Sequence, residues 1–422
     1  MADRVRVNSS SYPAGFNITL EETGPDTGIF ERTITFTTTG NANASARILN
    51  VSIGDTIYVN YTDAHNVTGA QQFIVASARI VKAIPDNLSL DRAYYNASHT
   101  ATITINDTDL NIDTTLAEAY YADRTPYSNV SVNSTSDPTG FNISIKETGA
   151  NTGVFTGWFI FKVGGPSNPE NRELNVSNGD IIYVTYINTK NVTGAQETMV
   201  TTAIFDNESP SITDLATDKS FAKNGTVVTI TFNATDAISS VVSTTVTVND
   251  KAATFVGVSN NTYTYNYTVS VNDTEGYAIV NVSATDNATN TATVSNSTLF
   301  VIDLSAPTFS NWTPAESEVV GKNTTISVNY SDAYSSINIS SVVIKVNGVD
   351  VTVNATVTAT GVSYAATNLP NGVNNVSVYV EDELGHSNTT LWNFTVDENP
   401  PRITDMIPYK TNDTTLTTGA TI

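Results

Sequence analysis

The chain has 422 residues but no cysteine and only three histidines, His65, His99 and His386. The lack of cysteine excludes disulfides, thiol chemistry and most structural zinc sites. Each histidine stands in a polar turn or at a strand edge, and none belongs to a zinc-binding or triad-like pattern. We therefore do not expect an enzyme. We expect the fold to be stabilised by the burial of apolar side chains, with bound ions as a second source of stability.

Basic residues are also scarce. The chain carries 19 Lys and Arg against 41 Asp and Glu, for a net charge of -22 and a pI near 4.3. Such a surface repels phosphate backbones and anionic membranes, so nucleic acid is not an expected partner. No apolar run approaches the roughly 18 residues that cross a bilayer. The sequence therefore predicts no membrane-spanning segment in this chain, and its opening residues carry no hydrophobic signal region.

Sustained helical periodicity is missing as well. Hydrophobic residues make up 40% of the chain and charged residues 14%, a balance that favours folding over disorder. Much of the remainder is Thr, Ser and Asn, which favour strands and turns. At roughly 100 to 150 residues per domain, the length requires several modules. The predicted fold class is all-β, with tandem immunoglobulin-like β-sandwich modules in an extended rod.

Two copies of one module align without a gap at a constant offset of 125 residues. The segment "GFNITLEETGPDTGIF" at 15–30 returns as "GFNISIKETGANTGVF" at 140–155. Alternating apolar residues after Gly-Asp turns predict hairpins within each copy. We assign residues 1–84 to an N-terminally incomplete copy and residues 85–206 to a complete one. Four loop glycines are expected to take positive φ: Gly24, Gly28, Gly149 and Gly153.

A second kind of module starts at three Asp-rich turns that end in proline, at 206–210, 303–307 and 397–401. A spacing of about 95 residues is typical of immunoglobulin-sized domains. After each turn, apolar residues recur at equivalent positions, as in the first core-facing strand of a sandwich. The boundaries that follow are two immunoglobulin-like domains, 207–303 and 304–397, and the truncated start of a further one, 398–422.

Both ends of the sequence are predicted to lie inside a module. Module 85–206 opens with strand-forming residues for which module 1–84 has no counterpart, and residues 401–422 hold only an opening strand. Two interpretations stay open. The chain is a fragment of a longer protein, or it is a filament subunit whose incomplete ends are completed by strand addition from neighbours.

The repeated segments "ETGPDTGIF" and "ETGANTGVF", with "DTDLN", resemble modules of archaeal surface-layer and other cell-surface proteins over about residues 1–206. The junctions, with "ATDNATN" and "VEDELGHSN", resemble immunoglobulin-like domains of bacterial and archaeal adhesins and surface layers over the remainder. This resemblance implies an assembled lattice or stalk that is often calcium-dependent and glycosylated. Because such modules serve many proteins as spacers, it implies little about ligands.

The Asn-x-Ser/Thr acceptor pattern of N-glycosylation recurs along the whole chain, more often than its Ser and Thr content alone would produce. Because this modification is made on the surfaces of exported proteins, the pattern predicts an extracellular, cell-surface location with covalent N-glycans. The other interpretation is that Asn and Thr are simply abundant in turns and strands. Representative acceptors are Asn17, Asn60, Asn66, Asn142, Asn191, Asn233, Asn281, Asn338 and Asn393.

One loop of module 85–206 has oxygen-bearing side chains spaced as in a calcium loop, because calcium selects carboxylate and carbonyl ligands. The candidate ligands are Asp107, Asp109, Asn111, Asp113 and, at the place of the bidentate ligand, Glu118. Ile112 occupies the position of the invariant glycine of an EF-hand. We therefore predict a strand-edge Ca²⁺ site rather than an EF-hand, with solvated turn residues as the other interpretation.

Acidic residues also gather at the module junctions, which resemble the calcium-stiffened linkers of cadherins. A Ca²⁺ ion bound there would tie two modules together and act as a structural cofactor. Ordinary turn-forming Asp is the other interpretation. The junction candidates are Asp206, Glu208, Asp303, Asp397 and Glu398.

Exposed aromatic rings can bind sugars by stacking. Trp312, Trp392 and Phe394 are expected in module cores because of their positions in the strand pattern. Trp158 has Thr33 as its counterpart in the first copy, so it is expected at the surface. It is the one candidate for a lectin-like contact.

These features predict a structural component of an archaeal cell surface, in an S-layer, sheath, filament or stalk. Its expected partners are other copies of itself, through lateral contacts and strand addition into a lattice or filament. Two other functions stay open. The chain could be a glycan-binding adhesin that uses Trp158, or the spacer stalk of a larger extracellular enzyme whose catalytic domain lies elsewhere.

Overall fold

The computed structural model describes residues 5–52, 54–64, 68, 70–80, 86–113, 115–122, 129–189 and 196–399. Within these ranges every regular element is a β-strand except one short 3-10 helix, η1 (Thr352–Asn354). The all-β class of tandem β-sandwich modules is therefore confirmed. The chain divides into two compact units, 1–206 and 207–422. None of the described segments is a helix long and apolar enough to cross a membrane.

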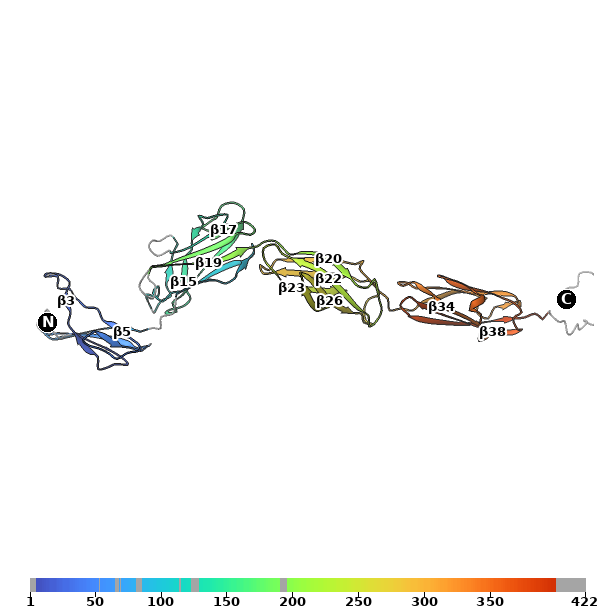
Figure 1. Ribbon diagram of the computed structural model, residues 1–422, viewed down its shortest axis with the longest axis horizontal. Coiled ribbons are helices and arrows are strands. Elements are labelled where there is room, and N and C mark those ends of the chain that lie inside the picture. Colours follow the sequence, from blue (N-terminus) through green and yellow to red (C-terminus); the bar gives the residue numbers. More distant parts are fainter. Residues whose placement is uncertain are drawn as a thin grey trace, which may run out of the picture. The chain divides into compact units, whose positions relative to one another are not determined.

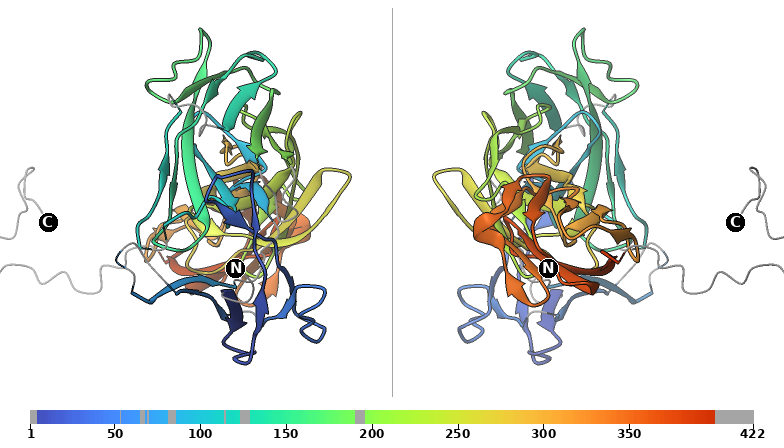
Figure 2. Two further views of the ribbon diagram at one scale, coloured as in Figure 1. Left: turned by 90° about the vertical axis from the view of Figure 1, so that its left-hand side faces the viewer. Right: turned by 90° about the vertical axis from the view of Figure 1, so that its right-hand side faces the viewer.

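Most strands of module 1–84, drawn in blue in Figures 1 and 2, have five residues or fewer, and only β7 and β8 are longer. Its largest sheet has the order β2-β1-β7-β8, while β3-β4 and β5-β6 are separate pairs. A small core gathers around Val7, Leu49 and Val51. The strands are β1 (Val5–Ser9), β2 (Phe16–Ile18), β3 (Glu21–Glu22), β4 (Phe30–Glu31), β5 (Thr35–Thr37), β6 (Ile48–Asn50), β7 (Thr56–Asp63) and β8 (Gln72–Arg79).

Module 85–206 is a closed sandwich of two sheets. One sheet runs β12-β15-β16-β11-β9 with β17 parallel to β16, and the other runs β10-β19-β18-β13-β14. Period-two patterns place alternate residues of β11, β16 and β18 in one core between the sheets. The strands are β9 (Asn87–Leu90), β10 (Tyr94–Tyr95), β11 (Thr100–Asn106), β12 (Ala119–Tyr120), β13 (Val130–Ser134), β14 (Phe141–Asn142), β15 (Ile145–Glu147), β16 (Val154–Val163), β17 (Glu173–Val176), β18 (Ile181–Asn188) and β19 (Glu197–Phe205).

The repeated "ETG" loop is held by its own glutamate. Glu147 Oε1 accepts the backbone N–H groups of Thr152 at 2.7 Å and Gly153 at 2.8 Å, and Glu22 Oε1 likewise accepts the N–H of Gly28 at 2.8 Å. A glutamate carboxylate caps loop N–H groups in both copies, buried at Glu147 and exposed at Glu22, which explains why these residues repeat. The motif is therefore a structural loop.

Two of the four loop glycines that were predicted to take a positive φ do so. Gly28 and Gly153 have φ of 66° and 61°, as predicted. Gly24 and Gly149 do not lie in the left-handed region, and the prediction for them is wrong. The second left-handed residue of each loop is instead Asp26 or Asn151, because a short polar side chain also tolerates this conformation.

Gly140 is a position where only glycine fits. Its φ is 51°, and an added Cβ would lie 1.8 Å from the carbonyl oxygen of Val132. We expect Gly140→Ala to destabilise module 85–206 by at least about 1–3 kcal/mol, the usual cost of such backbone strain. Gly164 is the matched control, since its φ is 77° but no atom lies within 4 Å of the added Cβ. Hydrogen exchange in module 85–206 should rise clearly more for Gly140→Ala than for Gly164→Ala, and equal rises would contradict the steric argument.

Residues 207–303 form a second kind of sandwich. Its sheets run β20-β22-β26-β25 and β24-β23-β28-β29, with a small third sheet β21-β30-β27. Alternate residues of β22 and β28 point into one core. The strands are β20 (Ser211–Thr217), β21 (Phe221–Ala222), β22 (Val227–Thr235), β23 (Val241–Val248), β24 (Lys251–Ala252), β25 (Thr254–Ser259), β26 (Thr262–Thr268), β27 (Gly276–Tyr277), β28 (Val280–Asp286), β29 (Thr291–Asn296) and β30 (Val301–Ile302).

Residues 304–397 repeat this plan (Figure 1). The sheets run β31-β33-β37-β36 and β32-β39-β38-β34-β35 around a core of their own. Residues 400–422, which hold nearly all of the predicted further module, lie outside the described residues. The strands are β31 (Thr308–Thr313), β32 (Val319–Val320), β33 (Thr324–Ser331), β34 (Ile337–Val346), β35 (Val349–Asp350), β36 (Thr356–Thr358), β37 (Gly361–Ala366), β38 (Gly372–Asp382) and β39 (Ser387–Val396).

Candidate metal centre

Asp382 and His386 face each other across the hairpin that joins β38 to β39. The segment "DELGH" forms a tight turn, with Gly385 at a φ of 82°. Asp382 Oδ1 accepts the N–H groups of Leu384 at 2.8 Å and His386 at 2.9 Å. Asp382 Oδ2 lies 2.7 Å from His386 Nδ1. The turn therefore fixes a buried carboxylate at the end of the strand and an imidazole beside it.

Asp303 approaches this pair from the linker that follows β30. Its side chain is fully buried, and the ligand atoms of Asp303, Asp382 and His386 all lie within 4.8 Å of one another. Asp303 Oδ1 accepts the N–H of Ser305 at 3.1 Å. Oδ2 is buried and has no hydrogen-bond partner among the described residues. A buried carboxylate oxygen without a donor costs free energy unless a cation occupies the space that it faces.

Asp332 adds a third carboxylate at the end of β33. Its Oδ1 accepts the N–H groups of Tyr334 at 2.9 Å and Ser335 at 3.0 Å, while its buried Oδ2 has no partner in the described part of the chain. Burial raises the pKa of Asp303 above its usual value. Hydrogen bonds from Ser335 and Ser305 oppose this shift, and the negative charges of Asp332 and Asp382 add to it. The raised pKa of Asp303 therefore reflects mainly the burial of its carboxylate, with a smaller effect of the neighbouring negative charges.

The donor set fits a hard cation. Carboxylate and carbonyl oxygens are the ligands that Ca²⁺ selects, at about 2.3–2.6 Å and with coordination by six to eight oxygens. The carboxylates of Asp303 and Asp382 lie within 4.8 Å of each other. His386 does not need to be a ligand, because its Nδ1–H can donate to Asp382 and orient that carboxylate toward the ion. We name this cluster, Asp303, Asp332, Asp382 and His386, the junction site.

The two loops of the junction site that lie in module 304–397 have copies 96 positions earlier, in module 207–303. Asp236 Oδ1 accepts the N–H groups of Ile238 at 2.9 Å and Ser239 at 2.7 Å, as Asp332 does in its own loop. Asp286 accepts both the backbone and side-chain N–H groups of Asn290, which stands in the place of His386. These loops are therefore a repeated feature of the immunoglobulin-like modules.

Of the predicted junction residues, the structure brings only Asp303 into the junction site. Asp206 is buried and its N–H donates to the carbonyl of Tyr95 at 2.8 Å, whereas Glu208 is exposed. Asp397 Oδ1 accepts the N–H of Asn399 at 2.8 Å. Glu398 accepts the N–H of Lys322 at 2.9 Å and lies 3.5 Å from its ammonium group. The sequence missed Asp332, Asp382 and His386, although their 96-residue repeat was a signal that could have found them.

The predicted calcium loop of module 85–206 is closed by hydrogen bonds among its own side chains. Asp107 is buried, and its oxygens accept the N–H groups of Asp109 and Leu110 and the hydroxyl of Tyr186. Asp113 accepts from Thr115, Glu118 Oε1 accepts the N–H of Asp113, and the Asn111 amide group donates to Asn151. Glu118 Oε2 and Asn111 Oδ1 are buried and have no hydrogen-bond partner among the described residues. Within the described residues, no three acidic or histidine groups of this loop meet at one point. A calcium ion there stays a prediction.

The predicted burial or exposure of the aromatic side chains is confirmed at some positions and wrong at one. Trp392 and Phe394 are buried as expected, and Trp392 donates to the carbonyl of Pro314 at 3.0 Å. Trp312 was expected in the core but is 39% exposed, because it lies within the β-bulge between Ser310 and Thr313 that shifts the register of β31 against β33. Trp158 is 45% exposed, as expected, but the guanidinium of Arg172 lies 4.4 Å from its ring centroid. Arg172 therefore occupies one face of the ring, and a sugar contact stays a prediction.

The remaining candidates lie at the surface or outside the described residues. His99 Nδ1 accepts the N–H of Asn96 at 3.2 Å, which is a turn contact, and His65 is not described. The acceptors Asn66 and Asn191 are also outside the described residues. None of the other representative acceptors is buried: Asn17 and Asn142 are exposed, and Asn60, Asn233, Asn281, Asn338 and Asn393 are half-buried. N-glycosylation at these positions stays a prediction.

The described residues thus define a protein of tandem β-sandwich modules with a candidate cation site in unit 207–422. No protein-family model and no curated protein matches the sequence. Solved structures with a similar fold include a three-domain immunoglobulin segment of titin, at 11% identity over 75% of this chain and 100% of that one, with a TM-score of 0.30. Another is the Ca²⁺-stabilised adhesin with which an Antarctic bacterium binds ice, at 14% identity over 94% and 90% of the two chains, with a TM-score of 0.30. At these identities and TM-scores the comparisons assign no function to the chain.

Proposed function

We propose that the chain is a non-catalytic structural component of an archaeal cell surface, in an S-layer, sheath, filament or stalk. In this proposal the modules carry N-glycans, and Ca²⁺ bound at the junction site stiffens the linker between modules 207–303 and 304–397. One observation gives the strongest support for the binding of Ca²⁺ at the junction site. The Asp303 carboxylate is fully buried beside Asp382, and its Oδ2 has no hydrogen-bond donor among the described residues.

The linker is held from both sides. Glu275, from module 207–303, accepts the N–H of Leu304 at 2.7 Å and the hydroxyl of Ser305 at 2.6 Å. Asp303 reaches the loops of module 304–397 that carry Asp332 and Asp382. A cation at the junction site would join the linker to both of these loops and restrict the bending of the linker. A structural component of a cell surface requires such a linker, because it must resist bending.

The acidic composition and the acceptor asparagines support the surface location. A net charge of -22 keeps the modules soluble and attracts cations, and the described acceptors leave the sandwich interiors undisturbed. Assembly into a lattice or filament through lateral contacts belongs to the same proposal.

Calcium is expected to narrow the distribution of distances between the two modules that flank the junction site. Because the chain has no cysteine, the exposed Val256 and Val353 can be changed to cysteine and spin-labelled without competing thiols. Double electron–electron resonance would then be measured in Ca²⁺ and after addition of EDTA. We expect a narrow distribution in Ca²⁺ and a broad one in EDTA, with a smaller effect of Mg²⁺, whose octahedral shell suits an all-carboxylate site poorly. Identical distributions in Ca²⁺ and EDTA would rule out the stiffening role.

A further inference from the structure

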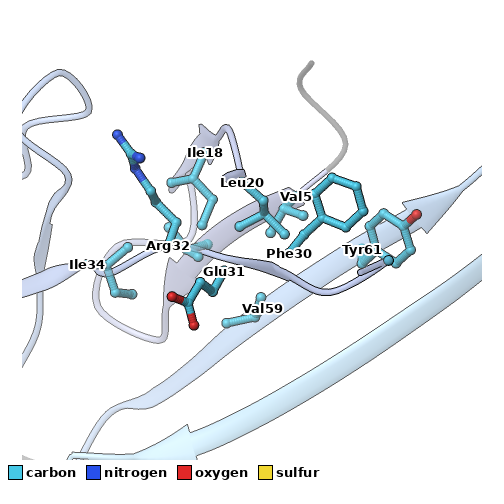
Figure 3. A pocket seen from close by; sticks show the side chains of 11 residues that line it. Val5, Ile18, Leu20, Phe30, Glu31, Arg32, Ile34, Val59 and Tyr61 are labelled. Atoms are coloured by element: carbon cyan, nitrogen blue, oxygen red, sulfur yellow. The ribbon is translucent and has the colours of Figure 1, made fainter. Parts of the chain in front are cut away.

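Module 1–84 has an open apolar groove on the side where module 85–206 is closed. The groove has a volume of about 680 Å³, and its walls include Val5, Ile18, Leu20, Phe30 and Val59. Figure 3 shows these side chains around one hollow, with Phe30 and Tyr61 toward one end and Ile34 toward the other. A groove of this size and composition normally holds a ligand or another part of a protein.

The repeat identifies the groove as half of an unfinished core. At the offset of 125 residues, Phe30 corresponds to Phe155 and Ile34 corresponds to Phe159. Phe155 and Phe159 are fully buried in module 85–206, whereas Phe30 is 47% exposed. The other apolar wall residues also correspond to buried residues of the complete module: Val130, Ile143, Ile145, Val184 and Tyr186. The walls of the groove are therefore positions that the fold normally covers.

The complete module also shows what covers these positions. There β11 lies antiparallel to β16, with Ala101 opposite Phe159 and Ile105 opposite Phe155, and β9 pairs with the far edge of β11. Ala101, Ile103 and Ile105 are fully buried in the core. The covering element is thus a polypeptide strand with apolar side chains at alternate positions.

In module 1–84 the corresponding backbone edge has no such partner. Within the described residues, β4 pairs only with β3, and β5 pairs only with β6. Residues 29–35, which correspond to the part of β16 that pairs with β11, therefore present N–H and C=O groups beside the apolar groove. A strand satisfies both needs at once, because it pairs with the backbone edge and buries every second side chain. A lipid would cover only the apolar groove, and a sugar would form hydrogen bonds only with the backbone edge.

We propose that the groove of module 1–84 binds an extended polypeptide strand that carries the pattern of residues 87–106. The strand lies antiparallel to residues 29–35, with apolar side chains opposite Ile34 and Phe30, as Ala101 and Ile105 lie in the complete module. Binding closes the sandwich and makes the donor strand part of its sheet. This interaction is independent of the cation at the junction site.

The test uses the full 422-residue chain and a fluorescent synthetic peptide of residues 87–106. We expect saturable binding by fluorescence anisotropy, and slower hydrogen exchange at residues 29–35 when the peptide is bound. A control peptide with Ile103→Asp and Ile105→Asp should not bind, because it would bury two carboxylates in the groove. EDTA should leave the binding unchanged, which separates this result from the test of the junction site.

Two neighbouring substitutions in the chain distinguish the groove from the outer face of the module. Ile34→Asp places a charge on the groove wall and should weaken peptide binding by about tenfold or more, which corresponds to about 1.4 kcal/mol. Thr33→Asp, on the exposed neighbouring position, should leave the affinity unchanged.

Four results would overturn the proposal. They are a lack of binding by the native peptide, equal binding by both peptides, protection of module 85–206 instead of residues 29–35, and equal loss of binding in the two chain variants. Self-association of the chain that Ile34→Asp abolishes, without peptide binding, would also overturn it and would identify a different segment of a second copy as the occupant.

Discussion

Replacing Phe155 with alanine is expected to lower the free energy of unfolding of module 85–206 by about 3–5 kcal/mol, the usual cost of truncating a buried phenylalanine. The ring is fully buried and lies 5.6 Å, centroid to centroid, from that of Tyr120. Removing it leaves a cavity between two sheets that cannot collapse onto each other. Denaturant-dependent hydrogen exchange, resolved by module, measures this loss in the intact chain.

The equivalent change in the first copy provides the matched control. Phe30→Ala alters the same position of the same repeat, but the ring is 47% exposed and borders the open groove. We expect it to cost less than about 1 kcal/mol, because nearly half of the residue's surface already faces water and the ring borders an open groove. Similar losses at the two positions would mean that module 1–84 has a closed core, and the strand-binding proposal would fail with that result.

Asp303→Asn is expected to have opposite effects with and without calcium. In EDTA the variant should be more stable than the native chain by roughly 1–3 kcal/mol, because the substitution removes a buried unpaired charge and adds an amide donor. In Ca²⁺ the native chain should gain about 2.7 kcal/mol when the free ion is at one hundred times its dissociation constant. The variant should lose most of this gain, since it lacks a ligand carboxylate. Chemical denaturation in the two buffers measures both effects.

Asp350→Asn serves as the control for the junction site. Asp350 is an exposed carboxylate on β35 of the same module, and hydrogen bonds from the side chain and the backbone of Thr352 lower its pKa. This variant should keep the full response to calcium. Loss of the response in both variants would indicate a general charge effect, and retention in both would remove Asp303 from the site.

The strand pattern was predictable because it depends on local alternation. In β22, every second residue is apolar in the sequence and buried in the structure. In β28 and β38 the same alternation holds except at the buried polar residues Asp286, Asn374 and Asp382. The exposure of Trp158 followed equally well from its counterpart Thr33. The prediction for Trp312 was wrong because a β-bulge changes which face a residue occupies, and the alternation of apolar residues does not show where a bulge falls.

The junction site was only partly predictable. Asp303 stood out because it lies in a repeated Asp and Pro turn, but Asp332 and Asp382 stand in segments that look like ordinary polar hairpins. Their side chains do cap local turns, as such residues usually do. The second carboxylate oxygen of Asp332 and of Asp303 distinguishes them, since each is buried without a partner among the described residues.

By itself, the sequence determined the all-β class, the repeats and the turns, because these depend on alternation, glycine and short-range hydrogen bonds between near neighbours in the chain. Only the tertiary structure decided that Asp303 meets Asp382 and that the first copy exposes its core. Both facts depend on segments far apart in the chain, and the packing of sheets, rather than any local preference, determines which distant side chains meet or remain uncovered.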